Sequence, residues 1–311
     1  MFSRRSHKLS AAFGAAVLAS SLLMTGSAAA ETPDRAGAAL KTISFPTDPR
    51  FTQLLGINDH GIIAGYHGDE NTEMTPNKGF TLQIADNQNK FTDENFPNSV
   101  QTQVIGINNN GATVGFYIDS AGNTHGFKKP KDKDAVTVDL PGTTFNQLLG
   151  LNNKGQAAGY FQDAAGLQHA YVRQKDGSFL VLALPQPSSQ ATGVNDKGTV
   201  VGFLQTSPAD TKSAGFILQD GKLTQLQHPG STFTQALGIN NSDDVVGSFV
   251  DANGVTHGFV YDHGNWQTVD GPNATSTVIN GINNHDALVG FFTVQDGQNT
   301  NTIGLVGSRK S

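Results

Sequence analysis

The chain has 311 residues, no cysteine, 36 glycines and only 15% charged residues. The absence of cysteine excludes disulfides, thiolate metal sites and a cysteine nucleophile. Low charge and abundant glycine are typical of an all-β chain with many turns, not of coiled coils or long helices.

The first 30 residues have the pattern of an export signal. Arg4, Arg5 and Lys8 precede an apolar stretch, residues 9–24, and small residues then lead to a predicted cleavage site before Glu31. The apolar stretch is shorter than the roughly 20 residues that span a bilayer. We therefore expect an exported protein, periplasmic or extracellular, without a membrane span after signal removal; the arginine pair leaves open Sec or twin-arginine export.

The rest of the chain is acidic. The net charge is −6, and without Arg4, Arg5 and Lys8, 17 basic residues stand against 26 acidic ones. Such a chain repels phosphate backbones, so we expect no nucleic-acid partner.

A repeat of about 45 residues determines the predicted architecture. Its signature is Gly-[Ile/Leu/Val]-Asn followed by a second glycine nine residues after the first. The six signature asparagines are Asn58, Asn108, Asn152, Asn195, Asn240 and Asn283. Each repeat has four short runs with strand character, which in the second copy are residues 103–108, 112–118, 125–128 and 136–140. This spacing predicts a four-stranded antiparallel meander in each copy.

The chain ends indicate how the copies are arranged. A lone strand, Leu40 to Pro46, comes before the first copy, and the last copy stops at Gly307 after three strands. We predict an all-β, six-bladed β-propeller of four-stranded blades, in which the N-terminal strand completes the last blade. The predicted organisation is a cleaved signal at 1–30, a linker at 31–39, one propeller domain at 40–307 and a tail at 308–311.

The repeat resembles the bacterial HAF extracellular repeat proteins. These carry Gly-x-Asn-x-x-Gly, then Val-Gly, then His-Ala-Phe, and His125-Gly126-Phe127 and His169-Ala170-Tyr171 are close forms. The spacing of the first two strands is also similar to that of NHL-type six-bladed propellers. Both resemblances imply export and a propeller fold, and neither implies a defined reaction.

Most repeated residues have a structural explanation. The six asparagines sit at the first position of a hairpin turn, where the side chain bonds to its own backbone, although a ligand ring is the alternative. His125, His169 and His257 recur at one position, but ring symmetry keeps equivalent positions apart, so we predict no metal site and no cofactor. An Asp-x-x-Gly turn alone lacks enough oxygen ligands for calcium.

Five repeated glutamines are the candidate ligand-binding residues, because they lie where the first strand of a repeat enters the channel mouth. Side-chain amides can bind sugar hydroxyls or carbonyl groups, or they can join neighbouring blades. The five residues are Gln53, Gln103, Gln147, Gln190 and Gln235.

Two functional hypotheses follow. The first is a monomeric, non-enzymatic binding module for a polysaccharide, peptide or protein, because repeated surface positions suit multivalent recognition. The alternative is a propeller hydrolase or lyase with an asymmetric polar or metal-assisted site at the channel mouth, although no linear catalytic motif is present and we assign no catalytic residue. Residues that break the repeat are the candidates for that site: His60, His67, Asp69, Glu70, Glu73, His228 and His285.

Overall fold

The computed structural model describes residues 40–68, 76–84 and 88–309, and all regular structure in these ranges is β-strand. The predicted signal peptide and linker lie outside the described residues. Among the described residues no helix is long and apolar enough to cross a membrane.

Each sequence repeat forms strands that pair in chain order, as antiparallel meanders. The first strands are β2 (Thr52–Ile57), β6 (Gln101–Ile107), β10 (Asn146–Leu151), β14 (Ser188–Val194), β18 (Phe233–Ile239) and β22 (Ser276–Ile282). The second strands are β3 (Ile62–His67), β7 (Thr113–Ile118), β11 (Ala157–Gln162), β15 (Val200–Gln205), β19 (Val245–Val250) and β23 (Ala287–Asp296). The third strands are β4 (Lys78–Gln83), β8 (Thr124–Lys129), β12 (Gln168–Arg173), β16 (Ala214–Gln219), β20 (Thr256–Asp262) and β24 (Asn299–Ser308). The fourth strands are β5 (Lys90–Asp93), β9 (Val136–Thr137), β13 (Phe179–Val181), β17 (Lys222–Leu226) and β21 (Asn265–Val269).

Within the described residues, the sixth repeat has no fourth strand of its own. β1 (Lys41–Ile43) pairs antiparallel with β24, so the strand order there is β1-β24-β23-β22. The strands of repeats 1 to 4 form four separate four-stranded sheets, while a single parallel bridge between Thr256 and Ser276 links repeats 5 and 6 into one eight-stranded sheet.

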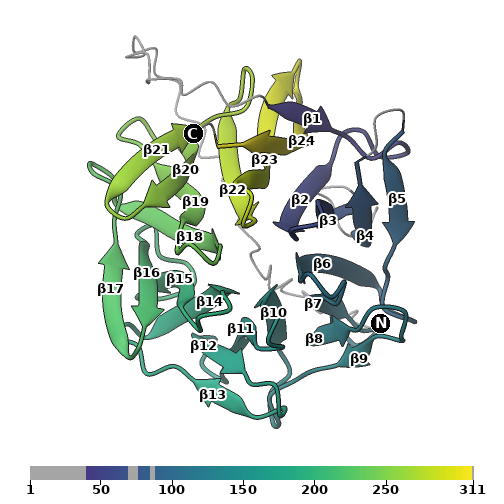
Figure 1. Ribbon diagram of the computed structural model, residues 1–311, viewed down its shortest axis with the longest axis vertical. Helices are drawn as coiled ribbons and strands as arrows, with labels where there is room; N and C mark the ends of the chain where they lie inside the picture. The colour runs from purple at the N-terminus through teal and green to yellow at the C-terminus, as the bar shows by residue number, and fades with distance from the viewer. Residues whose placement is uncertain (1–39, 69–75, 85–87, 310–311) are drawn as a thin grey trace, which may run out of the picture.

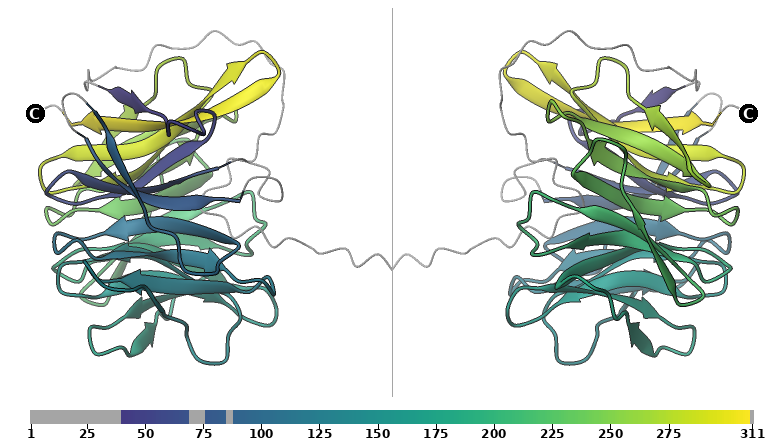
Figure 2. Two further views of the ribbon diagram at one scale, coloured as in Figure 1. Left: turned by 90° about the vertical axis from the view of Figure 1, so that its right-hand side faces the viewer. Right: turned by 90° about the vertical axis from the view of Figure 1, so that its left-hand side faces the viewer.

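The sheets are arranged around a centre, with the first strand of every repeat innermost (Figure 1). Seen edge-on, the strands run from one face of the molecule to the other (Figure 2). The turns between first and second strands lie on one face, which we call the asparagine face after its six signature asparagines. The connections from second to third strands, and from each fourth strand to the next repeat, lie on the opposite face.

Glycine at the first signature position lets the innermost strands approach one another. A Cβ atom on Gly150 would lie 2.7 Å from the Thr192 carbonyl oxygen and 2.9 Å from the Gly193 Cα. The same holds at other repeats. A Cβ atom on Gly56, Gly238 or Gly281 would lie 3.2 to 3.3 Å from the Cα atom of the equivalent glycine in the next repeat, which is Gly106, Gly281 and Gly56 respectively. A side chain here would push neighbouring repeats apart.

The core lies between neighbouring sheets, since both faces of each sheet are covered. Ile43 of β1, only 2% exposed, packs in a cluster with Leu54 and Phe80 of repeat 1 and Val289 of repeat 6. The N-terminal strand therefore contributes hydrophobic contacts to both ends of the repeat array.

We expect Ile43→Ala to lower the free energy of unfolding by about 2–4 kcal/mol, because it removes buried methyl groups and leaves a cavity. Denaturant unfolding of residues 31–311 measures the change. Val136→Ala is the matched control, since Val136 also lies on an outermost strand but is 53% exposed. Equal effects of the two substitutions would contradict a structural role for β1.

Candidate functional site

The signature asparagine of each repeat makes two kinds of hydrogen bond. In repeat 2, Oδ1 of Asn108 accepts the backbone N–H groups of Asn110 (3.1 Å) and Ala112 (3.0 Å), which fixes the turn. Its Nδ2 donates to the backbone carbonyl of Asn152 in the next repeat, at 3.1 Å. One side chain thus shapes its own turn and holds the neighbouring turn in place.

These inter-repeat bonds form a closed circuit. Each asparagine Nδ2 donates to the next asparagine carbonyl, at 2.9 to 3.3 Å, and the last bond runs from Asn283 back to Asn58. Both ends of each amide are therefore occupied by protein contacts. This is the arrangement of a scaffold, and it agrees with the structural interpretation of the motif.

A second circuit runs through the residues that follow the asparagines. Each backbone N–H donates to Oδ1 of the equivalent residue in the next repeat, at 2.7 to 2.9 Å. The six members are Asp59, Asn109, Asn153, Asp196, Asn241 and Asn284. The signal for this circuit in the sequence is that the position after the signature asparagine is Asn or Asp in all six copies.

Repeats 1 and 4 place carboxylates in this circuit. Oδ2 of Asp59 accepts hydrogen bonds from Nδ2 of Asn109 (2.6 Å) and Asn284 (2.8 Å), and Oδ2 of Asp196 accepts them from Asn153 (2.8 Å) and Asn241 (2.9 Å). Partial burial opposes ionisation, but the hydrogen bonds outweigh it and hold the pKa values of both carboxyl groups below their usual range. Both are therefore anionic at neutral pH.

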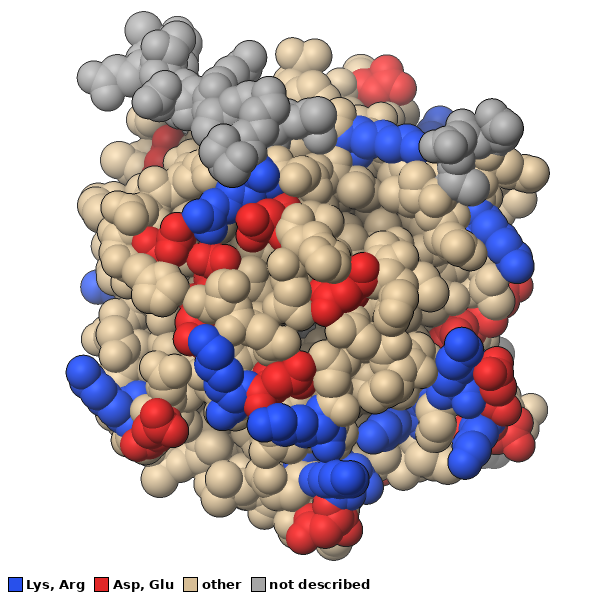
Figure 3. Space-filling model, viewed as in Figure 1, with Lys and Arg blue, Asp and Glu red and all other residues tan. Residues whose placement is uncertain are grey.

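The two circuits surround a small polar pocket at the centre of the asparagine face. Its volume is about 70 Å³, and its lining consists of the aliphatic signature residue, the asparagine and the following Asn or Asp from every repeat. Figure 3 shows this face, with acidic side chains on two sides of the central opening. The pocket is a preformed polar site, because hydrogen bonds to neighbouring repeats already fix its rim.

The five glutamines do not line this pocket. They lie near the opposite ends of the innermost strands and are buried, with exposed fractions of 0 to 6%. Gln53 accepts a hydrogen bond from the Tyr66 hydroxyl, and Gln190 donates one to Gln168 in the preceding repeat. The second bond is of the kind that joins neighbouring repeats, and a ligand-binding role for the glutamines stays a prediction.

The residues that break the repeat do not form one site within the described part of the chain. His60 precedes β3 and His67 ends it, so the two are separated by roughly 20 Å of extended chain. His67 bonds to Asp48 and stacks on Phe45, and His228 stacks on Phe249, each with ring centroids 3.5 Å apart. Asp69, Glu70 and Glu73 lie outside the described residues.

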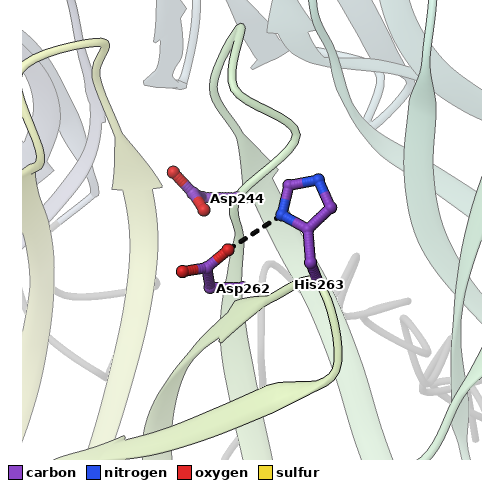
Figure 4. A group of neighbouring side chains, drawn as sticks. All are labelled: Asp244, Asp262 and His263. Atoms are coloured by element: carbon purple, nitrogen blue, oxygen red, sulfur yellow. Dashed lines mark hydrogen bonds and ion pairs between the residues drawn. The ribbon is translucent and has the colours of Figure 1, made fainter.

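One acidic cluster with a histidine has the composition of a metal site. Asp244, Asp262 and His263 point toward one another on the asparagine face (Figure 4). However, the Arg309 guanidinium already pairs with Asp244 (3.1 Å) and Asp262 (2.6 Å). Arg309 supplies the positive charge that a metal ion would bring, so the cluster attaches the C-terminal segment to repeat 5.

Histidines at the start of third strands pair with aspartates near the opposite face. His125 contacts Asp139 (2.6 Å) and Asp119 (3.1 Å), and His257 contacts Asp270 (2.9 Å) and Asp251 (3.5 Å). The hydrogen bond to Asp270 raises the pKa of His257, with a further contribution from Asp251, against the opposing effect of burial. Each imidazole is thus bound within its own repeat.

Comparison with known proteins supports the fold and assigns no family. No family model and no curated protein matches the chain. Among solved structures, AofleA from Arthrobotrys oligospora has a TM-score of 0.54 at 10% identity, covering 89% of this chain and 90% of its own. A protein described as a putative gluconolactonase has a TM-score of 0.52 at 12% identity, covering 88% and 93%. The β-propeller domain of the trilobed protease from Pyrococcus furiosus has a TM-score of 0.48 at 11% identity, covering 82% and 81%.

Similarities at this level of identity concern the fold alone. Together with antiparallel meanders arranged around a centre, they identify the chain as a β-propeller protein. The expected all-β fold is confirmed.

Asn108→Asp tests the asparagine circuit. We expect it to lower stability by about 1–3 kcal/mol, because it replaces a buried amide donor by a carboxylate facing the Asn152 carbonyl. Denaturant unfolding measures the effect. The control is Asn273→Asp, an exposed residue with a φ of 55° that aspartate tolerates. Unchanged stability of Asn108→Asp would rule out a structural role for the circuit.

His257 should make stability depend on pH. The pKa of His257 is higher in the folded than in the unfolded state. Its contribution to the free energy of unfolding is therefore complete at pH values below the pKa of the unfolded state, near 6.5, and is lost as the pH rises through the pKa of the folded state. We expect His257→Gln to lower the Tm by about 1 to 3 °C at pH 5.5 and by less at pH 8.5. His60→Gln, at an exposed turn position, should show no such difference. A pH-independent effect of His257→Gln would contradict the charged pair.

Proposed function

We propose that the protein is an exported, six-bladed β-propeller, closed by β1, that acts as a non-enzymatic binding module for a polysaccharide. The pairing of β1 with β24 and the hydrogen bond from Asn283 to Asn58 support ring closure. The signal-like N-terminus supports export, and the repeat motif supports kinship with HAF-type extracellular proteins.

The observation that carries the binding function is the pocket on the asparagine face. Six repeats contribute equivalent amide or carboxylate groups to its rim, and hydrogen bonds hold all of them in place before any ligand arrives. Each rim amide donates one N–H to a neighbouring carboxylate and keeps a second N–H, and each rim oxygen has a second lone pair, so the rim still offers donors and acceptors to sugar hydroxyls. A rigid rim also reduces the entropy that binding costs.

The presence of two carboxylates, Asp59 and Asp196, in the pocket rim is the observation that favours the alternative function, a hydrolase or lyase. They break the sixfold pattern at the channel mouth, as an asymmetric polar site requires. Their carboxylate oxygens are, however, already hydrogen-bonded to neighbouring amides, which leaves them less available for proton transfer or metal binding. We therefore favour binding over catalysis.

Thermal unfolding of residues 31–311 with a panel of glycans tests the proposal. A ligand at 100 times its Kd adds about 2.7 kcal/mol, which corresponds to a rise in Tm of several degrees. Trp266, the only tryptophan, supplies a second signal through its fluorescence.

The double variant Asp59→Asn/Asp196→Asn distinguishes the two functions. It replaces two acceptor oxygens by amide nitrogens that face neighbouring Nδ2 donors, so we expect stability to fall by about 1–3 kcal/mol per site. Under conditions where circular dichroism shows the variant folded, we expect glycan binding to change less than threefold. Cleavage of a glycan that this variant abolishes would establish the enzymatic alternative, and a Tm that falls with a chelator in the parent protein would show a bound metal ion and favour a metal-assisted site. Absence of a Tm shift with every glycan would contradict polysaccharide binding.

A further inference from the structure

Cationic side chains gather on one half of the asparagine face. They come from the turns and third strands of repeats 2 and 3, and Figure 3 shows Lys and Arg concentrated over this half of the molecule. We call this group the basic strip; its members are Lys128, Lys131, Lys133, Lys154, Arg173 and Lys175. Asp132, Asp134 and Asp176 lie in the same turns, so cations outnumber acids in these segments.

Two lysines of the basic strip occupy equivalent places in neighbouring repeats. The Lys131 side chain lies across Gly111, with Cδ 3.0 Å from where a Cβ on that glycine would be, and the Lys175 side chain lies across Gly155, with Cγ at 3.6 Å. Lys154 directly precedes Gly155, so Lys154 and Lys175 both belong to the turns beside this glycine, and the charge of Lys154 also acts on Asp196 of the next repeat. The absence of a side chain on each glycine lets the lysine stem lie against the turn.

Lys128 and Arg173 bring two further cations together from adjacent third strands. Both side chains are half-buried, and neither forms an ion pair with a carboxylate of the described residues. Burial, together with the nearby charge of Arg173, lowers the pKa of Lys128. Like charges held close together in this way oppose folding, and a bound anion relieves the repulsion.

The turns of repeats 5 and 6, on the opposite half of the same face, lack these lysines. The turn position of Lys154 and Lys197 is occupied by Ser242 in repeat 5 and by His285 in repeat 6. Asp243 and Asp286 replace the turn glycine there, with φ values of 69° and 60°. The repeat scaffold therefore does not require lysine, and the basic strip is an addition to it.

We propose that the basic strip binds an acidic polysaccharide, one that carries carboxylate groups along a chain of sugar hydroxyls. This proposal rests on the polysaccharide-binding function proposed above and specifies its ligand. Lysines spaced over two repeats suit a linear polymer, and the neighbouring asparagine turns suit its hydroxyls. The acidity of the whole protein and the aspartates within the basic strip disfavour a polyanion as dense as nucleic acid.

Isothermal titration of residues 31–311 with polygalacturonate, and with dextran of similar length as the neutral polymer, tests the proposal. We expect polygalacturonate to bind at least tenfold more tightly than dextran at 50 mM NaCl, and its affinity to fall several-fold at 300 mM. Lys154→Gln/Lys175→Gln should weaken polygalacturonate binding by tenfold or more. Lys78→Gln/Lys212→Gln is the matched control, since it removes the same charge from exposed positions at the opposite face, and should change affinity less than twofold.

The other outcomes separate the two proposals. Equal binding of both polymers, unaffected by the lysine variants, overturns the basic strip as the site and leaves polysaccharide binding intact. Equal weakening by the two double variants also overturns it, because only net charge then matters. Tighter binding of single-stranded DNA than of polygalacturonate overturns the ligand class. Binding of neither polymer overturns the acidic-polysaccharide proposal, and the absence of a Tm shift with every glycan of the panel then overturns polysaccharide binding as well.

Discussion

The close approach of six innermost strands is the constraint on which the rest of the structure depends. Glycine at the first signature position lets the backbones come within contact distance, and only then does each asparagine reach the carbonyl of the next repeat. The aspartate or asparagine that follows depends on the same distance for its own circuit. The pocket rim, the orientation of the turns and the packing of sheets all result from this central contact.

The fold could be predicted from the sequence to a large extent, because its signals are local and repeated. The predicted runs of the second repeat agree with β6 to β9 within a few residues, and the predicted strand at residues 40–46 contains β1. A turn asparagine and a nearby glycine determine backbone shape wherever they occur. Repetition of that pattern then indicates a single unit that must pack against copies of itself.

The site was harder to predict, because it depends on contacts between residues more than 40 positions apart. The motif identified Asn108 as a turn residue, but only the packing of neighbouring repeats brings its amide to Asn152. The residue after the signature asparagine forms the second circuit through bonds to the next repeat, so the sequence of one repeat does not predict it. The basic strip could not be predicted either, because its residues lie in separate turns and strands and the net charge of the chain is negative.

The bond from Asn283 to Asn58 joins residues 225 positions apart, and this has a consequence for the order of folding. Meanders can form locally, but contacts between the two ends of the repeat array carry a large loop-closure entropy, so we expect them to form after the intervening repeats. Until then, the outer edge of β24 has no partner strand and resembles a template for intermolecular pairing. Conditions that slow the pairing of β1 with β24 should therefore promote aggregation more than conditions that weaken any single repeat.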